Sequence, residues 1–291
     1  VGDFSDIPMK TGATVIVEKG ITGLGKTRTI KRLMILLSPQ VVVHSKNDTA
    51  RWVKATQVRY LYVQLSHDGS RGGLLTAILV ALDKAVHGTY SVDLPKKYRT
   101  IDKLIPSMVE LLHDYYLGVL IIDEVQYLSL VESDHATLMH LLLLNLSNSG
   151  IPIVLMGNPP GFSAMADLAQ FSSRILNSTY LHPCGAIDDD NVENWERVFE
   201  GIVRYYFLPE SLSSESDFSF TLKLRSGGIP KCALELWCAA QRGALFRGRD
   251  GISVADLDRV YFSGAFAEIR PLCEGFAEKD PIKLMRWSER G

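Results

Sequence analysis

Residues 20–27 read Gly20-Ile21-Thr22-Gly23-Leu24-Gly25-Lys26-Thr27 and match the phosphate-binding loop GxxxxGK[ST] at every fixed position. The β-branched run from Thr14 to Val17 precedes this loop and predicts a strand. The apolar residues after the loop recur at helical spacing: Ile30, Leu33, Met34 and Leu37. A chance match is the alternative, and the order of strand, glycine-rich loop and helix argues against it.

The residue types in this loop suit a nucleotide. Its glycines let backbone N–H groups turn toward phosphates, and the helix that follows directs its positive N-terminus at them. We expect Lys26 to neutralise charge on the β- and γ-phosphates and Thr27 to ligate magnesium. Residues Gly20 to Thr27 therefore predict ATP and Mg²⁺ as cofactors.

A second motif, Gly118-Val119-Leu120-Ile121-Ile122-Asp123-Glu124, is an apolar run that ends in two carboxylates. We expect Asp123 to hold magnesium directly or through water. Glu124 is placed to polarise an attacking water, which favours hydrolysis over phosphoryl transfer to a substrate. An Asp-Glu pair on its own is more often a solvated turn, but together with the phosphate-binding loop it favours catalysis.

Two further polar residues follow or precede predicted strands. Asn158 comes directly after the segment Pro152–Met156, at a carboxyl strand end where open α/β sheets bind ligands, and could orient the water. The alternative is an asparagine chosen for turn geometry before Pro159. Arg174 precedes the last predicted core strand and is a candidate to reach a neighbouring subunit's γ-phosphate, with a solvated arginine as the alternative.

Short segments dense in β-branched or aromatic residues predict further strands. They are Val41–His44, Val58–Leu65, Leu117–Asp123, Pro152–Met156 and Thr179–His182. Helical patterns lie between them, from Leu74 to Val86 and from Leu104 to Leu112. This alternation predicts an α/β fold with a parallel sheet flanked by helices on both faces. Together with the phosphate-binding loop, it indicates a fold of the P-loop NTPase kind.

Strand signals largely disappear after residue 187. The acidic triplet Asp188-Asp189-Asp190 precedes apolar residues at helical spacing, and helices are expected at Pro230–Leu245 and at Val254–Phe266, with Ser253 as N-cap of the second. We therefore predict an ATPase core at 1–187, a smaller helical lid at 188–250, and a C-terminal helical segment and tail at 251–291.

The 291 residues include 31 Lys and Arg against 33 Asp and Glu, a net charge of −2. No global positive field therefore favours nucleic acid, and any DNA contact has to come from a local patch. The segment Asp93–Lys103, a connection between two helical patterns, is such a patch. Its basic residues are candidate DNA contacts, with a solvated loop as the alternative: Lys96, Lys97, Arg99 and Lys103.

The four cysteines, Cys184, Cys232, Cys238 and Cys273, form no CxxC pair and no metal-binding spacing. They favour free thiols in a reducing cytoplasm. No apolar stretch reaches the roughly 20 residues of a membrane-spanning helix, so we expect no membrane partner. Because the chain opens on Val1 without a basic-then-apolar signal, we expect its start to be a truncation.

With the phosphate-binding loop, the Asp-Glu pair, Asn158, Arg174 and a helical lid in this order, the chain resembles an AAA+ ATPase. Three stretches are more narrowly similar to the TnsC/TniB family of transposition-regulator ATPases: Tyr62-Val63-Gln64-Leu65-Ser66-His67-Asp68-Gly69-Ser70, Ile121-Ile122-Asp123-Glu124-Val125-Gln126-Tyr127-Leu128-Ser129, and Ile252-Ser253-Val254-Ala255-Asp256-Leu257-Asp258-Arg259-Val260-Tyr261. Taken singly, His67, Asp68 and Gln126 are turn or helix-start residues, so the combination carries the resemblance.

The resemblance implies ATP-dependent self-assembly into rings or helical filaments on double-stranded DNA, in the bacterial cytoplasm. By the same resemblance, a target-selection protein of the TniQ/TnsD type nucleates assembly, transposase subunits of the TnsA/TnsB type contact the oligomer, and hydrolysis dismantles it. The family also has a basic stretch that follows the DNA backbone at the place of residues 93–103. One departure is Lys231, where many AAA+ lids carry an arginine that senses the γ-phosphate. Lys231 either contacts phosphate or faces solvent.

Other interpretations share this core. A replication-initiation or helicase-loader ATPase would differ in its partners. A nucleotide-gated DNA scaffold with little turnover would be expected to lack Lys26, Asp123 or Glu124, and all three are present. A P-loop kinase would need an acceptor site near the phosphates, and Glu124 as water activator argues against it.

Overall fold

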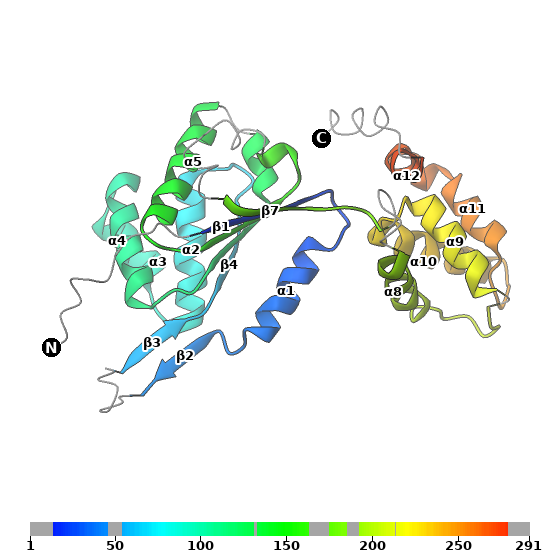
Figure 1. Cartoon of the computed structure of the whole chain (residues 1–291), viewed down its shortest axis with the longest axis horizontal. Coiled ribbons are helices and arrows are strands. Elements are labelled where there is room, and N and C mark those ends of the chain that lie inside the picture. The colour runs from blue at the N-terminus through cyan, green and yellow to red at the C-terminus, as the bar shows by residue number, and fades with distance from the viewer. Residues whose placement is uncertain are drawn as a thin grey trace. The chain divides into compact units, whose positions relative to one another are not determined.

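The computed structural model describes residues 14–45, 54–130, 133–162, 175–184, 192–212 and 214–278 (Figure 1). The chain divides into two compact units. The first, which we call the core unit, holds Val1–Gly20 and Lys26–Tyr180. The second, the helical unit, holds Ile21–Gly25 and Leu181–Gly291.

The core unit is built on a five-stranded sheet of order β4-β5-β6-β1-β7. Its strands are β1 (Val15–Gly20), β4 (Leu61–Gln64), β5 (Leu120–Asp123), β6 (Ile153–Gly157) and β7 (Ile175–Leu181). The pairs β4–β5, β5–β6 and β6–β1 are parallel. Ile153 of β6 lies between Val15 of β1 and Leu120 of β5. The predicted parallel α/β sheet is confirmed.

Helices cover both faces of this sheet (Figure 1). Along β5, Leu120 and Ile122 enter the main core, whereas Ile121 points to the opposite face and packs with Ile30. The main core is closed by α2 (Arg71–Val86), α4 (Ile101–Asp114) and α5 (Ser133–Asn148), with α3 (Tyr90–Lys97) beside them. The opposite face is covered by α1 (Lys26–Leu36). Strands buried on both faces explain why β5 reads as a continuous apolar run.

The prediction of one strand from Val58 to Leu65 is wrong. The segment contains the end of β3 (Ala55–Val58) and the whole of β4, and β3 pairs antiparallel with β2 (Val41–His44) in a separate two-stranded sheet. The chain changes partners at Arg59, whose N–H donates to the Gln40 carbonyl at 2.8 Å while its own carbonyl accepts from Val119 at 3.1 Å. These long-range bonds leave no continuous ladder through Arg59.

Over the residues that the structure describes, the helical unit packs five α-helices around one apolar core. They are α8 (Val192–Val203), α9 (Glu215–Ser226), α10 (Pro230–Phe246), α11 (Val254–Tyr261) and α12 (Arg270–Ala277). Trp237 is fully buried at the centre, edge-on to Phe218 with ring centroids 5.6 Å apart. Among the described residues of both units, none of the helices is long and apolar enough to cross a membrane.

The helix predicted over Val254–Phe266 is shorter in the structure. It ends at Tyr261, and a 3-10 turn, Gly264–Phe266, follows. The Arg270 guanidinium donates to the carbonyls of Tyr261 and Ser263, both at 3.0 Å, so terminal carbonyls are satisfied without a further helical turn. The predicted N-cap, Ser253, is confirmed.

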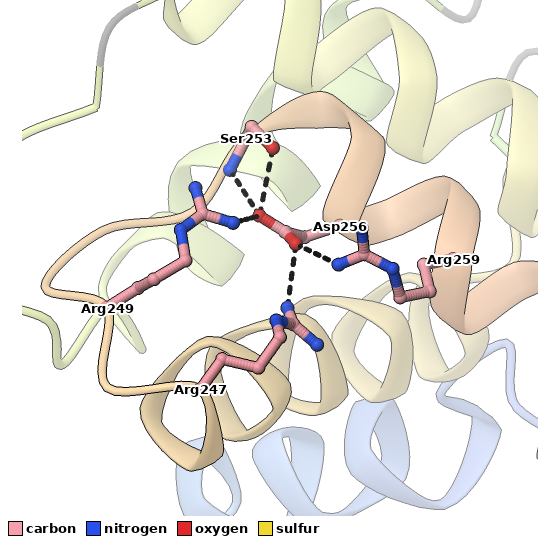
Figure 2. A network of polar contacts seen from close by, with 5 residues as sticks. All are labelled: Arg247, Arg249, Ser253, Asp256 and Arg259. Atoms are coloured by element: carbon pink, nitrogen blue, oxygen red, sulfur yellow. Dashed lines mark hydrogen bonds and ion pairs between the residues drawn. The ribbon is translucent and has the colours of Figure 1, made fainter.

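A buried carboxylate fixes the start of α11. Asp256 is 1% exposed and accepts hydrogen bonds from the guanidinium groups of Arg247, Arg249 and Arg259 at 2.7–2.8 Å, and from the N–H and hydroxyl of Ser253 (Figure 2). Burial raises the pKa of Asp256, but the bonds from Ser253 and Arg249 outweigh burial and hold that pKa below its ordinary value. Asp256 therefore ties the end of α10 to the start of α11.

Asp256→Ala should lower the free energy of unfolding by about 2–3 kcal/mol, because it leaves three crowded guanidinium groups and a helix cap without their acceptor. Urea unfolding measures the change. The matched control is Asp258→Ala, which breaks one partly exposed pair with Arg225 and should cost no more than about 1 kcal/mol. Equal losses in the two variants would contradict a special role for Asp256.

The depressed pKa of Asp256 adds a pH signature. A carboxyl group whose folded pKa is lowered stabilises the protein fully above its unfolded pKa of about 4 and stops doing so as pH falls through the folded value. The stability difference between the parent and Asp256→Ala should therefore be constant above about pH 5 and shrink below about pH 4.

Candidate nucleotide-binding site

The phosphate-binding loop needs its glycines for conformational reasons. Gly23 and Gly25 have φ values of +94° and +93°, a left-handed backbone that side chains with a Cβ rarely adopt. By its contacts the loop Ile21–Gly25 groups with the helical unit. Ile21 is buried in that unit's core, and the Gly23 carbonyl accepts a hydrogen bond from the Lys231 backbone N–H at 3.2 Å.

Lys26 reaches the carboxyl ends of two neighbouring strands. Its Nζ donates to the Gly20 carbonyl of β1 at 2.6 Å and to Asn158 Oδ1, just past β6, at 3.1 Å. Burial lowers the pKa of Lys26, and the nearby carboxylates of Asp123 and Glu124 act in the opposite direction. The structure thus brings Lys26 and Asn158 together, as the predicted site requires.

The candidate metal ligands meet at one oxygen atom. Thr27 Oγ1 donates to Asp123 Oδ2 at 2.8 Å, and the Tyr62 hydroxyl donates to the same oxygen at 2.9 Å. Burial, followed by the bond to Asp123, raises the pKa of Tyr62 to about 12, so its hydroxyl stays a donor at neutral pH. A hydroxyl and a carboxylate are hard oxygen donors that fit Mg²⁺ beside nucleotide phosphates. Sequence reasoning gave Tyr62 no role.

The Gln126 side chain connects Glu124 to Asn158 by two hydrogen bonds. The Gln126 side chain donates from Nε2 to the Glu124 carboxylate and accepts from the Asn158 backbone N–H at 3.1 Å. The Glu124 backbone adopts φ +64°, and its N–H donates to Asp123 Oδ1 at 2.8 Å. The core unit therefore gathers Glu124, Asn158 and the candidate metal ligands at one edge of the sheet.

Other predicted site residues lie elsewhere. Arg174 falls in 163–174, outside the described residues. Lys231 belongs to the helical unit, where its Nζ lies 3.8 Å from the Glu235 carboxylate and both side chains are about half exposed.

The four candidate DNA residues are exposed on the core unit. The prediction that these residues lie in one connection between helices is wrong. Lys96 and Lys97 end α3, Lys103 lies in α4, and Arg99 lies between the two helices. The Asp83 carboxylate accepts from the N–H groups of Tyr90 and Ser91 at 2.7 and 2.8 Å. These bonds cap the start of α3, a helix that the sequence pattern does not predict.

Comparison with known proteins agrees with this fold. A family model described as an AAA domain matches residues 9–165, and the chain belongs to this family of P-loop ATPases. Comparison with curated proteins gives no match.

Among solved structures, ORC1 of Aeropyrum pernix in complex with DNA is similar at TM-score 0.56 and 18% identity, over 89% of this chain and 60% of that chain. ORC2 of the same organism is similar at TM-score 0.52 and 15% identity, over 86% of this chain and 61% of that chain. The Walker-type ATPase PABY2304 of Pyrococcus abyssi is similar at TM-score 0.50 and 15% identity, over 92% of this chain and 72% of that chain. The chain thus spans about three fifths of the ORC chains, and at these identities the likeness shows the fold alone.

Lys26→Ala should abolish nucleotide binding, because it removes the positive charge that faces the β- and γ-phosphates. Binding of a fluorescent ATP analogue, followed by anisotropy, measures this. Lys31→Ala is the matched control, since Lys31 is an exposed lysine on the same helix. Retained nucleotide binding in Lys26→Ala would contradict the site assignment.

Proposed function

We propose that this protein hydrolyses ATP and assembles in an ATP-dependent way into rings or filaments on double-stranded DNA, where it regulates transposition by linking target-site selection to the transposase. The observation that carries the ATPase part is the convergence of Lys26, Thr27, Asp123, Glu124 and Asn158 at one sheet edge. The transposition part is supported by the sequence resemblance to the TnsC/TniB family.

Each residue of the site has a defined task in this proposal. Bound ATP with its magnesium ion supplies the phosphoanhydride bond that is cleaved. Lys26 and the loop N–H groups bind the β- and γ-phosphates, while Thr27 and Asp123 hold the ion. Glu124 takes a proton from the attacking water at its carboxylate oxygen, and Asn158 orients that water. Arg174 is proposed to act on the γ-phosphate bound by a neighbouring subunit.

DNA binding is supported by the exposed basic side chains around the α3–α4 junction and by the fold likeness to an ORC1 protein whose structure includes DNA. A single protomer offers few phosphate contacts, and the net charge of −2 adds no general attraction. Assembly repeats the basic residues along the duplex, so affinity rises by multivalency.

The second candidate function is replication initiation or helicase loading, which the fold likeness to ORC proteins favours. Partner binding separates the two. The ATP-loaded protein on duplex DNA is mixed with purified TniQ/TnsD-type and TnsA/TnsB-type proteins, or with a replicative helicase, and co-sedimentation is measured. Retention of the transposition proteins supports the first function; retention of the helicase alone overturns it.

Glu124→Gln should abolish ATP hydrolysis while keeping nucleotide binding, because the amide has nearly the shape of the carboxylate but cannot accept a proton from water. We expect oligomers on DNA that persist after free ATP is removed, visible by electron microscopy. Hydrolysis at the parent rate would contradict the assignment of Glu124 as the group that activates water.

Replacing Lys96, Lys97, Arg99 and Lys103 with alanine should weaken binding to all duplexes alike and flatten the dependence of affinity on salt, because fewer counterions are released. ATP binding should stay unchanged. The charge-matched control replaces four exposed basic residues elsewhere: Lys31, Arg32, Arg204 and Arg242. If the control lowers the salt slope as much as the test variant does, α3 and α4 are not the DNA surface.

A further inference from the structure

Gln126 joins two strand ends of the core unit through one side chain. Its amide nitrogen donates to the Glu124 carboxylate, which follows β5. Its amide oxygen accepts from the backbone N–H of Asn158, which follows β6 and lies 32 residues further along the chain. Asn158 in turn accepts from Lys26. A continuous line of hydrogen bonds therefore runs from the lysine of the phosphate-binding loop to Glu124.

The backbone around Gln126 is held by close packing against two glycines. A Cβ at Gly161 would lie 2.5 Å from Gln126 Cα and 2.6 Å from its nitrogen. A Cβ at Gly157 would lie 2.9 Å from Gln126 Oε1. Neither position has room for a side chain, so the turn after β6 packs directly on Gln126. The place of Gln126 is thus set by backbone contact as well as by its own hydrogen bonds.

We infer that Gln126 is a positioning residue that holds the Glu124 carboxylate in fixed relation to Asn158. This inference rests on the proposed role of Glu124 as the group that polarises water. A glutamate side chain has three rotatable bonds, and fixing it in advance removes an ordering cost that otherwise adds to the barrier of reaction. In this role Gln126 acts through Glu124 and makes no contact with the phosphates itself.

Two substitutions separate the polar role of Gln126 from its volume. Gln126→Glu keeps the length and the acceptor for Asn158, but it replaces the donor facing Glu124 by a like charge. Gln126→Met keeps the length and removes both polar groups. Each should lower kcat by about tenfold or more and leave the Kd for a fluorescent ATP analogue unchanged.

The matched control makes the same chemical change away from the site. Gln57 lies on β3, where its Oε1 is 3.0 Å from His44 Nε2. Gln57→Glu should hydrolyse ATP with the kcat of the parent. If Gln57→Glu lowered kcat as much as Gln126→Glu does, an added negative charge anywhere in the core unit would impair hydrolysis. That result would overturn the inference.

A reciprocal exchange tests the contact without using activity. Urea unfolding of the nucleotide-free protein should show a lower midpoint for Gln126→Glu, because two carboxylates then face each other. In the double variant Glu124→Gln/Gln126→Glu, donor and acceptor are exchanged and the hydrogen bond re-forms in the opposite direction. The midpoint should return toward that of the parent, while hydrolysis stays absent.

The results separate the inference from the function on which it rests. Parent kcat in both Gln126 variants overturns the positioning role and leaves the proposed function intact. A fall in nucleotide affinity that matches the fall in kcat in Gln126→Met assigns the residue to binding, which also overturns that role. Parent hydrolysis in Glu124→Gln overturns the proposed role of Glu124 as the group that activates water, and the inference with it. A double variant no more stable than Gln126→Glu overturns the direct contact.

Discussion

The burial of one carboxylate organises the nucleotide site. Asp123 is 1% exposed, and a buried charge is tolerated only where hydrogen-bond donors surround it. Its donors come from three segments: Thr27 in the first turn of α1, Tyr62 on β4, and the N–H of Glu124. The hydrogen bonds to Asp123 therefore join α1 and β4 to the end of β5, and the arrangement of the candidate site residues depends on that junction.

The same bond explains the backbone of Glu124. Donation from its N–H to the preceding carboxylate accompanies a φ of +64°, which is uncommon for a residue with a Cβ and costs on the order of 1 kcal/mol. A hydrogen bond to a charged acceptor contributes about 1.5–3 kcal/mol and offsets that cost. The turn also directs the Glu124 side chain to Gln126, so the strained backbone serves the placement of the carboxylate.

Much of the fold could be predicted because it rests on local patterns. The strand–loop–helix around Gly20 to Thr27 and the apolar run of β5 are local, and the structure contains both. The division of Val58–Leu65 depends on Arg59 bonding to Gln40 and Val119, and such partners leave no mark on the local pattern. The start of α3 depends likewise on Asp83, seven residues before Tyr90. Tertiary hydrogen bonds overrode propensity in both places.

The candidate site was predictable in its motif residues and not in the residues that support them. Because side chains alternate between the two faces of a strand, Asp123 lies on the same face as Ile121, the face that α1 covers. The register of β4 and β5 sets Tyr62 opposite Ile121, and the Tyr62 hydroxyl thereby reaches Asp123. That register requires β4 beside β5, a strand order that the sequence does not state. For Gln126 a weak signal existed in two glycines, Gly157 and Gly161, that lie on either side of Asn158 in the sequence. Two glycines so close together indicate that another backbone lies against the turn, and that backbone belongs to Gln126.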